Sequence, residues 1–225
     1  MKLLDLFCGA GGCSVGYAMA GFDVTGVDIN AQPNYPFEFV CADWHDYLRD
    51  NWQQFDVIHA SPPCQAYSGM RHITISRYGS APDHPDLIAH VRQKLIETGK
   101  VYVIENVRGS PVETQIILCG AAFGHERLSR HRHFESSILL PAPPACRCRD
   151  NDISIGIYGD KPDGRRVSYR HHKFSRVALS VDEAKNLMQI PWMNEWDEIK
   201  EAIPPAYTHW IGNHVRYFLL NSADR

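Results

Sequence analysis

The sequence predicts an α/β fold built on a doubly wound, mostly parallel sheet. Short apolar runs alternate with helical patterns through the first half of the chain, and a glycine-rich loop joins the first run to the first helix. Polar or reactive residues follow directly after several of these runs. Regular succession of strand, helix and strand requires crossover connections, which place helices on both faces of the sheet. In such sheets, ligands bind at the carboxyl ends of the strands.

The expected elements divide the chain into three parts. A capping box at Ser180 predicts a helix through Met188. We expect a main domain over 1–134, a small insert over 135–175 that is polar and basic, and a C-terminal segment over 176–225 that returns to the main domain. Strands are expected at 2–7, 23–27, 37–41, 56–60, 101–104, 116–119 and 134–140, with helices at 11–20 and 84–98.

Composition excludes several classes of protein. The 225 residues are 44% hydrophobic and 22% charged, which is ordinary for a soluble globular protein. We expect no membrane span because no run reaches the roughly 18 apolar residues that one requires. The chain opens on a strand-like run without a basic flank, so no secretion signal is expected. Seven scattered cysteines indicate reduced thiols in the cytoplasm better than a disulfide framework.

Charge is concentrated in the middle of the chain. Residues 121–176 hold eleven Lys and Arg against six Asp and Glu, a net of +5, so the remainder carries −8 of the total of −3. A basic segment on an acidic body suits a groove for a polyanion, since phosphate contacts supply much of the affinity for nucleic acids. The alternative is a solvated basic loop.

The glycine-rich loop 7–12 lies between a strand and a helix, where glycines allow close approach of the backbone to a ligand. It does not fit the dinucleotide pattern, since Ser14 takes the place of the third glycine. Asp28 ends the next strand, where it can bind a ribose diol. Asp43 follows the third strand beside Trp44, a pair that suits an adenine ring. We therefore predict an adenosyl ligand rather than a purely structural turn.

Cys64 and Glu105 are the predicted reactive pair. A thiolate can add to carbon-6 of a pyrimidine and make carbon-5 nucleophilic enough to take a methyl group. Two prolines stiffen the loop before Cys64. A carboxylic acid at Glu105 can stabilise the charge that develops at ring nitrogen 3. The structural alternatives are a buried cysteine and a surface glutamate at a strand end.

With these residues placed, the chain resembles the DNA (cytosine-5)-methyltransferases, of the compact kind found in bacteria and their phages. The resemblance implies a Rossmann-like class I methyltransferase domain that uses S-adenosyl-L-methionine, with the short insert as the target-recognition region. Six motifs follow the family's order across residues 3–215. They are DLFCGAGG (5–12), SPPCQ (61–65), ENV (105–107), RHR (130–132), RVALSVDEAKNLMQIP (176–191) and IGNHV (211–215).

The resemblance also implies individual roles. Cys64 acts as the nucleophile, Glu105 holds and protonates a flipped cytosine, Arg132 contacts its 2-oxo group and orients Glu105, and Arg130 lies nearer the backbone. The S-adenosyl-L-methionine site is lined by Phe7, Gly9, Ala10, Gly11, Asp28, Ile29, Asp43, Trp44, Pro63 and Asn213. Double-stranded DNA is the expected partner, and its predicted contacts are Gln65, Asn106, Lys161, Arg165, Arg166, Arg170 and Lys173.

Two departures from the family pattern qualify these roles. Ser129 stands where a glutamine usually begins the paired-arginine motif, which weakens the assignment of Arg130. The insert has only about 40 residues, so we expect it to read few base pairs or to need a second copy or a partner protein.

Other features are interpreted as structural. Cys146 and Cys148 are separated by one residue, fewer than zinc pairs usually have, so no metal is predicted even with His171 and His172 downstream. His131 is expected to be a bystander in a basic groove. Cys8, Cys13, Trp192 and Trp196 are expected to be packing residues, and His133 a second bystander.

Two other functions remain open from the sequence. One is a tRNA cytosine-5 methyltransferase of the same fold, although its Cys-Phe-Thr signature is absent. The other is a catalytically inactive module that binds the donor and DNA. Protection against restriction, disguise of phage DNA and regulation of transcription would all use the same chemistry.

Overall fold

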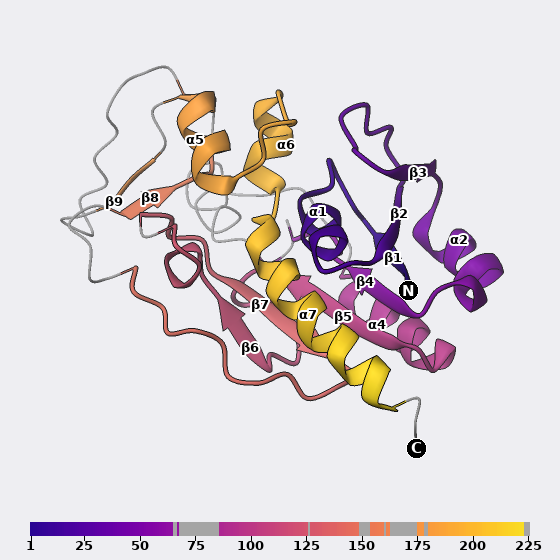
Figure 1. Ribbon diagram of the computed structural model, residues 1–225. Helices are drawn as coiled ribbons and strands as arrows, with labels where there is room; N and C mark the ends of the chain where they lie inside the picture. The colour runs from indigo at the N-terminus through magenta and orange to yellow at the C-terminus, as the bar shows by residue number, and fades with distance from the viewer. Residues whose placement is uncertain are drawn as a thin grey trace.

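A seven-stranded sheet forms the centre of the protein, with strand order β3-β2-β1-β4-β5-β7-β6 (Figure 1). The first five of these strands are parallel, whereas β7 runs antiparallel to both β5 and β6. The predicted doubly wound, mostly parallel sheet is therefore confirmed. Its strands are β1 (Lys2–Leu6), β2 (Asp23–Asp28), β3 (Glu38–Cys41), β4 (Val57–Ala60), β5 (Val101–Asn106), β6 (Ile116–Leu118) and β7 (Arg132–Ser136).

The computed structural model describes most of the chain. The described residues are 1–64, 67, 86–125, 127–148, 154–159, 161–162, 175–177 and 180–222.

Helices cover the sheet on both faces. Successive residues of a strand point to opposite faces, so Leu3 and Leu4 of β1 enter two different cores. The first core is shared with α1 (Gly12–Met19) and α7 (Pro205–Ser222), and the second with α2 (Trp44–Asn51) and α4 (Ile88–Thr98). Two 3₁₀ turns, η1 (Trp52–Gln54) and η2 (Gly120–Ala122), complete this domain.

Glycine allows α1 and α7 to lie side by side, as Figure 1 shows. A Cβ atom at Gly16 would stand 2.1 Å from the Pro205 carbonyl oxygen and from Thr208 Oγ1. At Gly212 it would stand 2.7 Å from the Ala20 Cβ. Any side chain at these two positions would separate the helices and open the first core.

A small lobe lies at one end of the sheet. It contains α5 (Val181–Met188), α6 (Trp196–Glu201) and the parallel pair β8 (Ser154–Gly156) and β9 (Ser175–Val177). Its core draws on residues from both sides of the boundary expected at 175–176, because Ile155 and Ile157 pack with residues from 184 to 199. Its buried members are Ile155, Ile157, Ala184, Met188, Ile190, Met193, Trp196, Ile199 and, from the main domain, Ala10 and Leu128.

The lobe shows which local predictions succeeded. The Ser180 side chain accepts a hydrogen bond from the Glu183 amide at 3.0 Å and caps α5, as predicted. The indole nitrogens of Trp192 and Trp196 donate to the carbonyls of Ala10 and Gly159, both at 2.8 Å. Both tryptophans therefore hold the lobe together or against the main domain, as expected.

Several predicted boundaries were wrong. The strand expected at 134–140 runs over Arg132–Ser136 instead, and Leu140 packs into the first core from a loop. Helices α2, α6 and α7 were not predicted at all. Their stability comes from the cores they cover rather than from local propensity, which pattern reading cannot weigh. Among the described residues, no helix combines the length and apolar character that crossing a membrane requires.

Candidate active site

The reactive cysteine and the buried glutamate lie at the carboxyl ends of neighbouring strands. Cys64 follows β4 through the Ser61-Pro62-Pro63 loop, and Glu105 is the penultimate residue of β5. The side-chain amide of Asn106 donates to the Pro62 carbonyl at 2.8 Å, which ties the cysteine loop to the end of β5. The predicted convergence of these two groups at one sheet edge is therefore what the topology produces.

Asn106 differs from its predicted role. It is 1% exposed, and its Oδ1 accepts from the Val107 amide at 2.9 Å while its nitrogen bonds Pro62. An amide occupied by two backbone partners is not available to DNA. Asn106 is a positioning residue for the cysteine loop rather than a substrate contact.

Glu105 is buried and paired. It is 5% exposed, and Arg132 Nε on β7 lies 3.1 Å from its Oε1. Burial raises the pKa of Glu105, while Arg132 and a hydrogen bond from Ser61 oppose that rise. Such an acid can retain its proton closer to neutral pH than a surface glutamate, and it can donate that proton in a dry pocket.

The Cys64 thiol is half-buried next to this acid. Burial raises the pKa of Cys64, and the Glu105 carboxylate raises it further, while Arg132 lowers it. The thiolate therefore becomes easier to form once Glu105 is protonated or its charge is otherwise removed. The two groups form one electrostatic unit, with Arg132 as the shared cation.

A buried chain of polar groups behind the site was not predicted. His59 of β4 is fully buried, and its ring nitrogens lie 3.0 Å from the Tyr17 hydroxyl and 2.9 Å from the Ser61 hydroxyl. Burial lowers the pKa of His59 to about 3, so the ring is neutral. Tyr17 and His59 hold the Ser61 hydroxyl in place, and Ser61 in turn forms a hydrogen bond with Glu105. His59 was read as part of an apolar strand because nothing in its spacing marks a partner.

Arg130 was predicted as a catalytic residue of the paired-arginine motif, but it holds the small lobe instead. It is 5% exposed and donates to the carbonyls of Ile157 at 3.0 Å and Lys200 at 2.7 Å. Burial lowers its pKa to about 9, which still leaves the side chain charged at neutral pH. Arg130 fastens the small lobe to the start of β7, and Arg132 alone of the pair contacts Glu105.

In the glycine-rich loop 7–12, called the donor loop below, Gly9 is the glycine with open space beside its Cα. Gly9 has a φ of +50°, and a Cβ built on it would meet nothing within 4 Å. The Gly9 amide donates to Asp28 Oδ2 at 3.1 Å, and Asp28 Oδ1 accepts from the Asn30 amide at 2.9 Å. A carboxylate has about four acceptor positions, so Asp28 keeps capacity for a ligand hydroxyl.

Gly11 and Ala10 of the same loop are enclosed by neighbouring residues. Gly11 has a φ of +87°, and a Cβ there would lie 2.9–3.1 Å from Tyr35 and Pro36. Ala10 is buried in the lobe core, and its carbonyl accepts from Trp192. Both predicted cofactor residues therefore shape the loop, whereas Gly9 provides the open approach.

Several other residues predicted at the cofactor site differ in how exposed they are. Trp44 is 9% exposed and packs in the second core, with its ring centroid 5.6 Å from that of Phe7. It supports Phe7, which has a φ of 59° and is half-buried, rather than offering its own face. Ile29 is 69% exposed, and Asp43 is exposed while capping α2 through the amides of His45 and Asp46. Pro63 is also exposed at this edge.

Asn213 lies away from the donor loop, contrary to prediction. It is exposed on α7 next to Gly212, which packs on Ala20 at the far end of α1. The C-terminal segment meets this loop and the start of α1 through Trp192 and through residues 203–208 instead. The Ile203 carbonyl oxygen would stand 2.4 Å from a Cβ at Gly12, and Thr208 Oγ1 donates to the Cys13 carbonyl at 2.8 Å.

Most predicted DNA contacts cannot be placed. Lys161 is exposed and lies close to Gly159 in the sequence. Arg127 and Arg147, elsewhere in the basic segment, are exposed as well. The others, Gln65, Arg165, Arg166, Arg170 and Lys173, lie outside the described residues.

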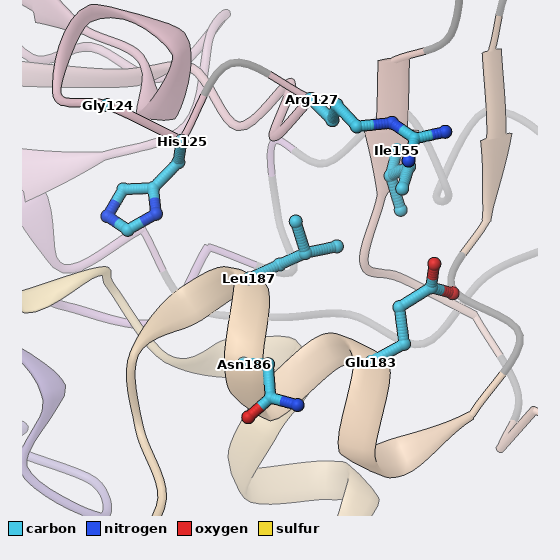
Figure 2. Close-up of a pocket in the computed structure, with 7 residues that line it drawn as sticks. All are labelled: Gly124, His125, Arg127, Ile155, Glu183, Asn186 and Leu187. Carbon is cyan, nitrogen blue, oxygen red and sulfur yellow. The ribbon is translucent and has the colours of Figure 1, made fainter.

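A surface hollow of about 620 Å³ lies on the small lobe and not at this site. Figure 2 shows Leu187 and Glu183 of α5 projecting towards the segment that carries Arg127. Its lining is Gly124, His125, Arg127, Ile155, Glu183, Asn186 and Leu187, which includes none of the reactive or donor-loop residues. The reactive residues Cys64 and Glu105 therefore lie at the strand ends, outside this hollow.

Comparison with known proteins relates the first 110 residues to one family. Residues 1–110 match the family model described as C-5 cytosine-specific DNA methylase. Over these residues the chain is similar to the C-5 cytosine-specific DNA methylases. The matched region contains the donor loop, Cys64 and Glu105, whereas Arg132 follows it in the chain.

Individual relatives agree with that assignment. The chain is 33% identical over 128 residues to the type II methyltransferase M.XorII of Xanthomonas oryzae pv. oryzae, and 30% identical over 120 residues to M.HindV of Haemophilus influenzae. Each match covers 48% of this chain, but only 28% and 38% of the relatives. The chain thus spans well under two thirds of the curated relatives that it matches.

Solved structures show the same fold over nearly the whole chain. A prophage-encoded protein of Escherichia coli, described as a DNA modification methyltransferase, matches with a TM-score of 0.62 at 16% identity, covering 98% of this chain and 99% of that one. DNMT2 of Spodoptera frugiperda matches with a TM-score of 0.61 at 14% identity, covering 96% and 99%. The main domain and the lobe together therefore share the overall fold of these two proteins.

A buried acid in β1 makes the stability of the protein depend on pH. Asp5 of β1 is fully buried, accepts a hydrogen bond from Ser14, and has its pKa raised from 3.8 to about 7 by burial. Between these values the folded chain binds more protons than the unfolded one, so raising the pH lowers the free energy of unfolding. The full loss, above pH 7, is roughly 4 kcal/mol at 1.36 kcal/mol per pKa unit.

We expect Asp5→Asn to remove this dependence. Relative to the parent chain, the variant should gain unfolding free energy at pH 8 and gain little near pH 4. Urea unfolding at both pH values measures the difference. An equal change at pH 4 and pH 8 would contradict the assignment of the titration to Asp5.

Asn106→Ala should loosen the cysteine loop. The substitution leaves the Pro62 carbonyl without its buried donor, which costs about 1–3 kcal/mol of unfolding free energy. For the methyl transfer proposed below, we expect kcat to fall about tenfold or more, because small misplacements of a reacting group are costly, while donor affinity is unchanged. Urea unfolding, steady-state kinetics and donor titration measure these three quantities. A normal kcat in the destabilised variant would show that the tie to Pro62 is only structural.

Proposed function

We propose that this protein transfers a methyl group from S-adenosyl-L-methionine to carbon-5 of cytosine in duplex DNA. The observation that carries the proposal is the joined pair of strand ends, where Cys64 and Glu105 meet and Asn106 holds their loops together. The match of residues 1–110 to the C-5 cytosine methylases supports the same chemistry.

The reaction begins at Cys64. Its sulfur forms a bond to carbon-6 of the cytosine, and the electron pair of the carbon-5–carbon-6 double bond becomes available at carbon-5. Charge that develops at nitrogen 3 is met by the proton of Glu105, held in place by Arg132 at 3.1 Å. After carbon-5 has accepted the methyl group, water takes the proton from carbon-5. The electron pair of that bond restores the carbon-5–carbon-6 double bond and expels the Cys64 sulfur as a thiolate, while nitrogen 3 returns its proton to Glu105.

The residues at the donor loop fit S-adenosyl-L-methionine. Its sulfonium supplies the electrophilic methyl group. Asp28 has acceptor capacity for the ribose hydroxyls, the open side of Gly9 admits the ligand, and the exposed Ile29 offers an apolar face for the adenine. Phe7 and Asp43 border the same edge, with Trp44 supporting Phe7 from below.

The target base must leave the DNA stack to reach this pair of strand ends, because the reacting carbon is otherwise covered within the duplex. The basic segment supplies the phosphate contacts that hold the duplex. We assign this role to Lys161 among the described residues and, from the sequence, to Arg165, Arg166, Arg170 and Lys173. A small recognition region of this kind is completed by a second copy or a partner protein.

The test is methyl transfer by the purified chain from tritiated S-adenosyl-L-methionine to unmethylated duplex DNA, tRNA and ribosomal RNA. Counts retained in DNA, with bisulfite sequencing showing protected cytosines in one short context, support the proposal. Tritium retained only in RNA would show that RNA, and not DNA, is the substrate. This outcome is tested because a ribosomal RNA methyltransferase of Colwellia psychrerythraea is 28% identical over 131 residues. Donor and DNA binding without transfer would indicate an inactive module.

A further inference from the structure

Four potential metal ligands meet beside the catalytic arginine. They are Cys119, His131, Cys146 and Cys148, and their ligand atoms all lie within 4.8 Å of one another. The Cys146 and Cys148 sulfurs are 3.2 Å apart, and they lie 3.4 and 3.7 Å from His131 Nε2. The group comes from three separate stretches of chain, so the fold and not the local sequence assembles it.

The separations among Cys146, Cys148 and His131 lie within about 0.6 Å of those in a tetrahedral zinc site. Bonds of about 2.3 Å to sulfur and 2.0–2.1 Å to nitrogen place neighbouring ligand atoms about 3.5–3.8 Å apart. A disulfide would instead need sulfurs about 2.05 Å apart. Cys146 is exposed, so burial in a core does not account for its position.

We propose that this cluster binds one structural Zn²⁺ through three thiolates and one imidazole. Three soft sulfur ligands select zinc over the hard cations Mg²⁺ and Ca²⁺. Four protein ligands leave no open coordination position, which is the arrangement of structural rather than catalytic zinc. The single residue between Cys146 and Cys148 had argued against a metal, but Cys119 and His131 supply the remaining ligands that spacing alone did not reveal.

The positions of the ligands indicate what the zinc holds. Cys119 directly follows β6, and His131 directly precedes β7. Cys146 and Cys148 lie in the segment that leads from β7 towards the small lobe, where residues 144–147 are all exposed and provide no apolar core. A zinc ion would fasten this segment to the sheet edge, in place of hydrophobic packing.

The same ion would support the active site. Arg132 is the next residue after His131, donates to the His131 carbonyl at 3.0 Å and pairs with Glu105. Fixing the His131 ring therefore fixes the backbone that carries Arg132. This part of the inference rests on the proposed function, whereas zinc binding itself does not.

Metal content tests the site independently of activity. Protein purified under reducing conditions from zinc-supplemented cells should contain about one zinc per chain by mass spectrometry of the metal, as a closed structural site does. The Cys146→Ser/Cys148→Ser double variant should contain less than about a tenth of that, since two of four ligands are lost. Cys41→Ser changes an exposed cysteine outside the cluster and should keep the full content.

Cobalt reports which atoms bind. Co²⁺ in place of zinc should give sulfur-to-metal charge-transfer absorption and the intense visible bands of a tetrahedral site. His131→Cys should retain the metal with a changed spectrum, which keeps the test valid if the double variant fails to fold. Three results would each overturn the proposal. They are a parent chain that binds no zinc and gives no cobalt spectrum, a Cys146–Cys148 disulfide in protein purified under reducing conditions, and an unchanged zinc content in the folded double variant. Full zinc in a chain without methyl transfer would refute the proposed function alone.

Discussion

Replacing Cys64 with serine is expected to reduce methyl transfer to below about 1% of the parent rate, because a neutral hydroxyl is a far weaker nucleophile than a thiolate. The substitution changes one atom in a loop that Asn106 holds from the β5 side. Donor binding should remain, since Cys64 is not part of the donor loop. Tritium transfer to duplex DNA measures the rate, and calorimetric titration with S-adenosyl-L-methionine measures donor affinity.

The control for this prediction is the same substitution at another site. Cys41→Ser alters an exposed thiol at the end of β3 and should leave the unfolding free energy within about 0.5 kcal/mol of the parent value. Near-normal methylation by Cys64→Ser would reject the covalent mechanism while leaving the fold and the family assignment untouched. Bisulfite sequencing of DNA from cells that express each variant gives the same comparison in vivo.

Glu105→Gln is expected to lower the rate by about 10²–10⁴-fold, the usual contribution of a positioned general acid. Glutamine has nearly the same shape but cannot give up a proton to nitrogen 3. Because Arg132 loses a charged partner while the desolvation of an ionised carboxylate is relieved, the variant should stay folded. Single-turnover methylation and urea unfolding measure both quantities.

A second readout separates electrostatics from shape. The Glu105 carboxylate contributes to the raised pKa of Cys64, so its removal should lower that pKa. The pH profile of Cys64 alkylation, followed by peptide mass spectrometry, should therefore shift to lower pH in Glu105→Gln. Glu97→Gln changes an exposed glutamate on α4 and serves as the control. An unchanged profile would mean that the two groups do not interact as the structure indicates.

The two variants together distinguish failures of different kinds. Loss of activity in both, with normal unfolding and donor binding, is expected if Cys64 and Glu105 act on the same base. Loss in Cys64→Ser alone would leave protonation of the base to another group. Arg132 pairs with Glu105 at 3.1 Å, but a guanidinium retains its proton at neutral pH and is a poor substitute for the acid.

The sequence by itself determined the sheet, the donor loop and the reactive pair. Phe7, Asp28, Cys64 and Glu105 each lie at or just after the end of an apolar run, and parallel strands bring such ends to one edge. This inference needs only local patterns and the rule for parallel sheets. For that reason the placement of Cys64 relative to Glu105 could be predicted without knowledge of any distant contact.

Roles that depend on distant partners were decided only by the tertiary structure. Arg130 resembled the second arginine of a catalytic pair in the sequence, but its guanidinium donates to the carbonyls of Ile157 and Lys200. Asn213 matched a motif, but the packing of Gly212 on Ala20 places it at the far end of α1.

The cysteine cluster shows the same limit most clearly. Cys119 and His131 are separated from Cys146 and Cys148 by strand β7 and a loop, so no short spacing connects the four. A sequence pattern reports neighbours along the chain, whereas a buried hydrogen bond or a metal site is defined by neighbours in space. The fold alone brings these ligands together beside Arg132.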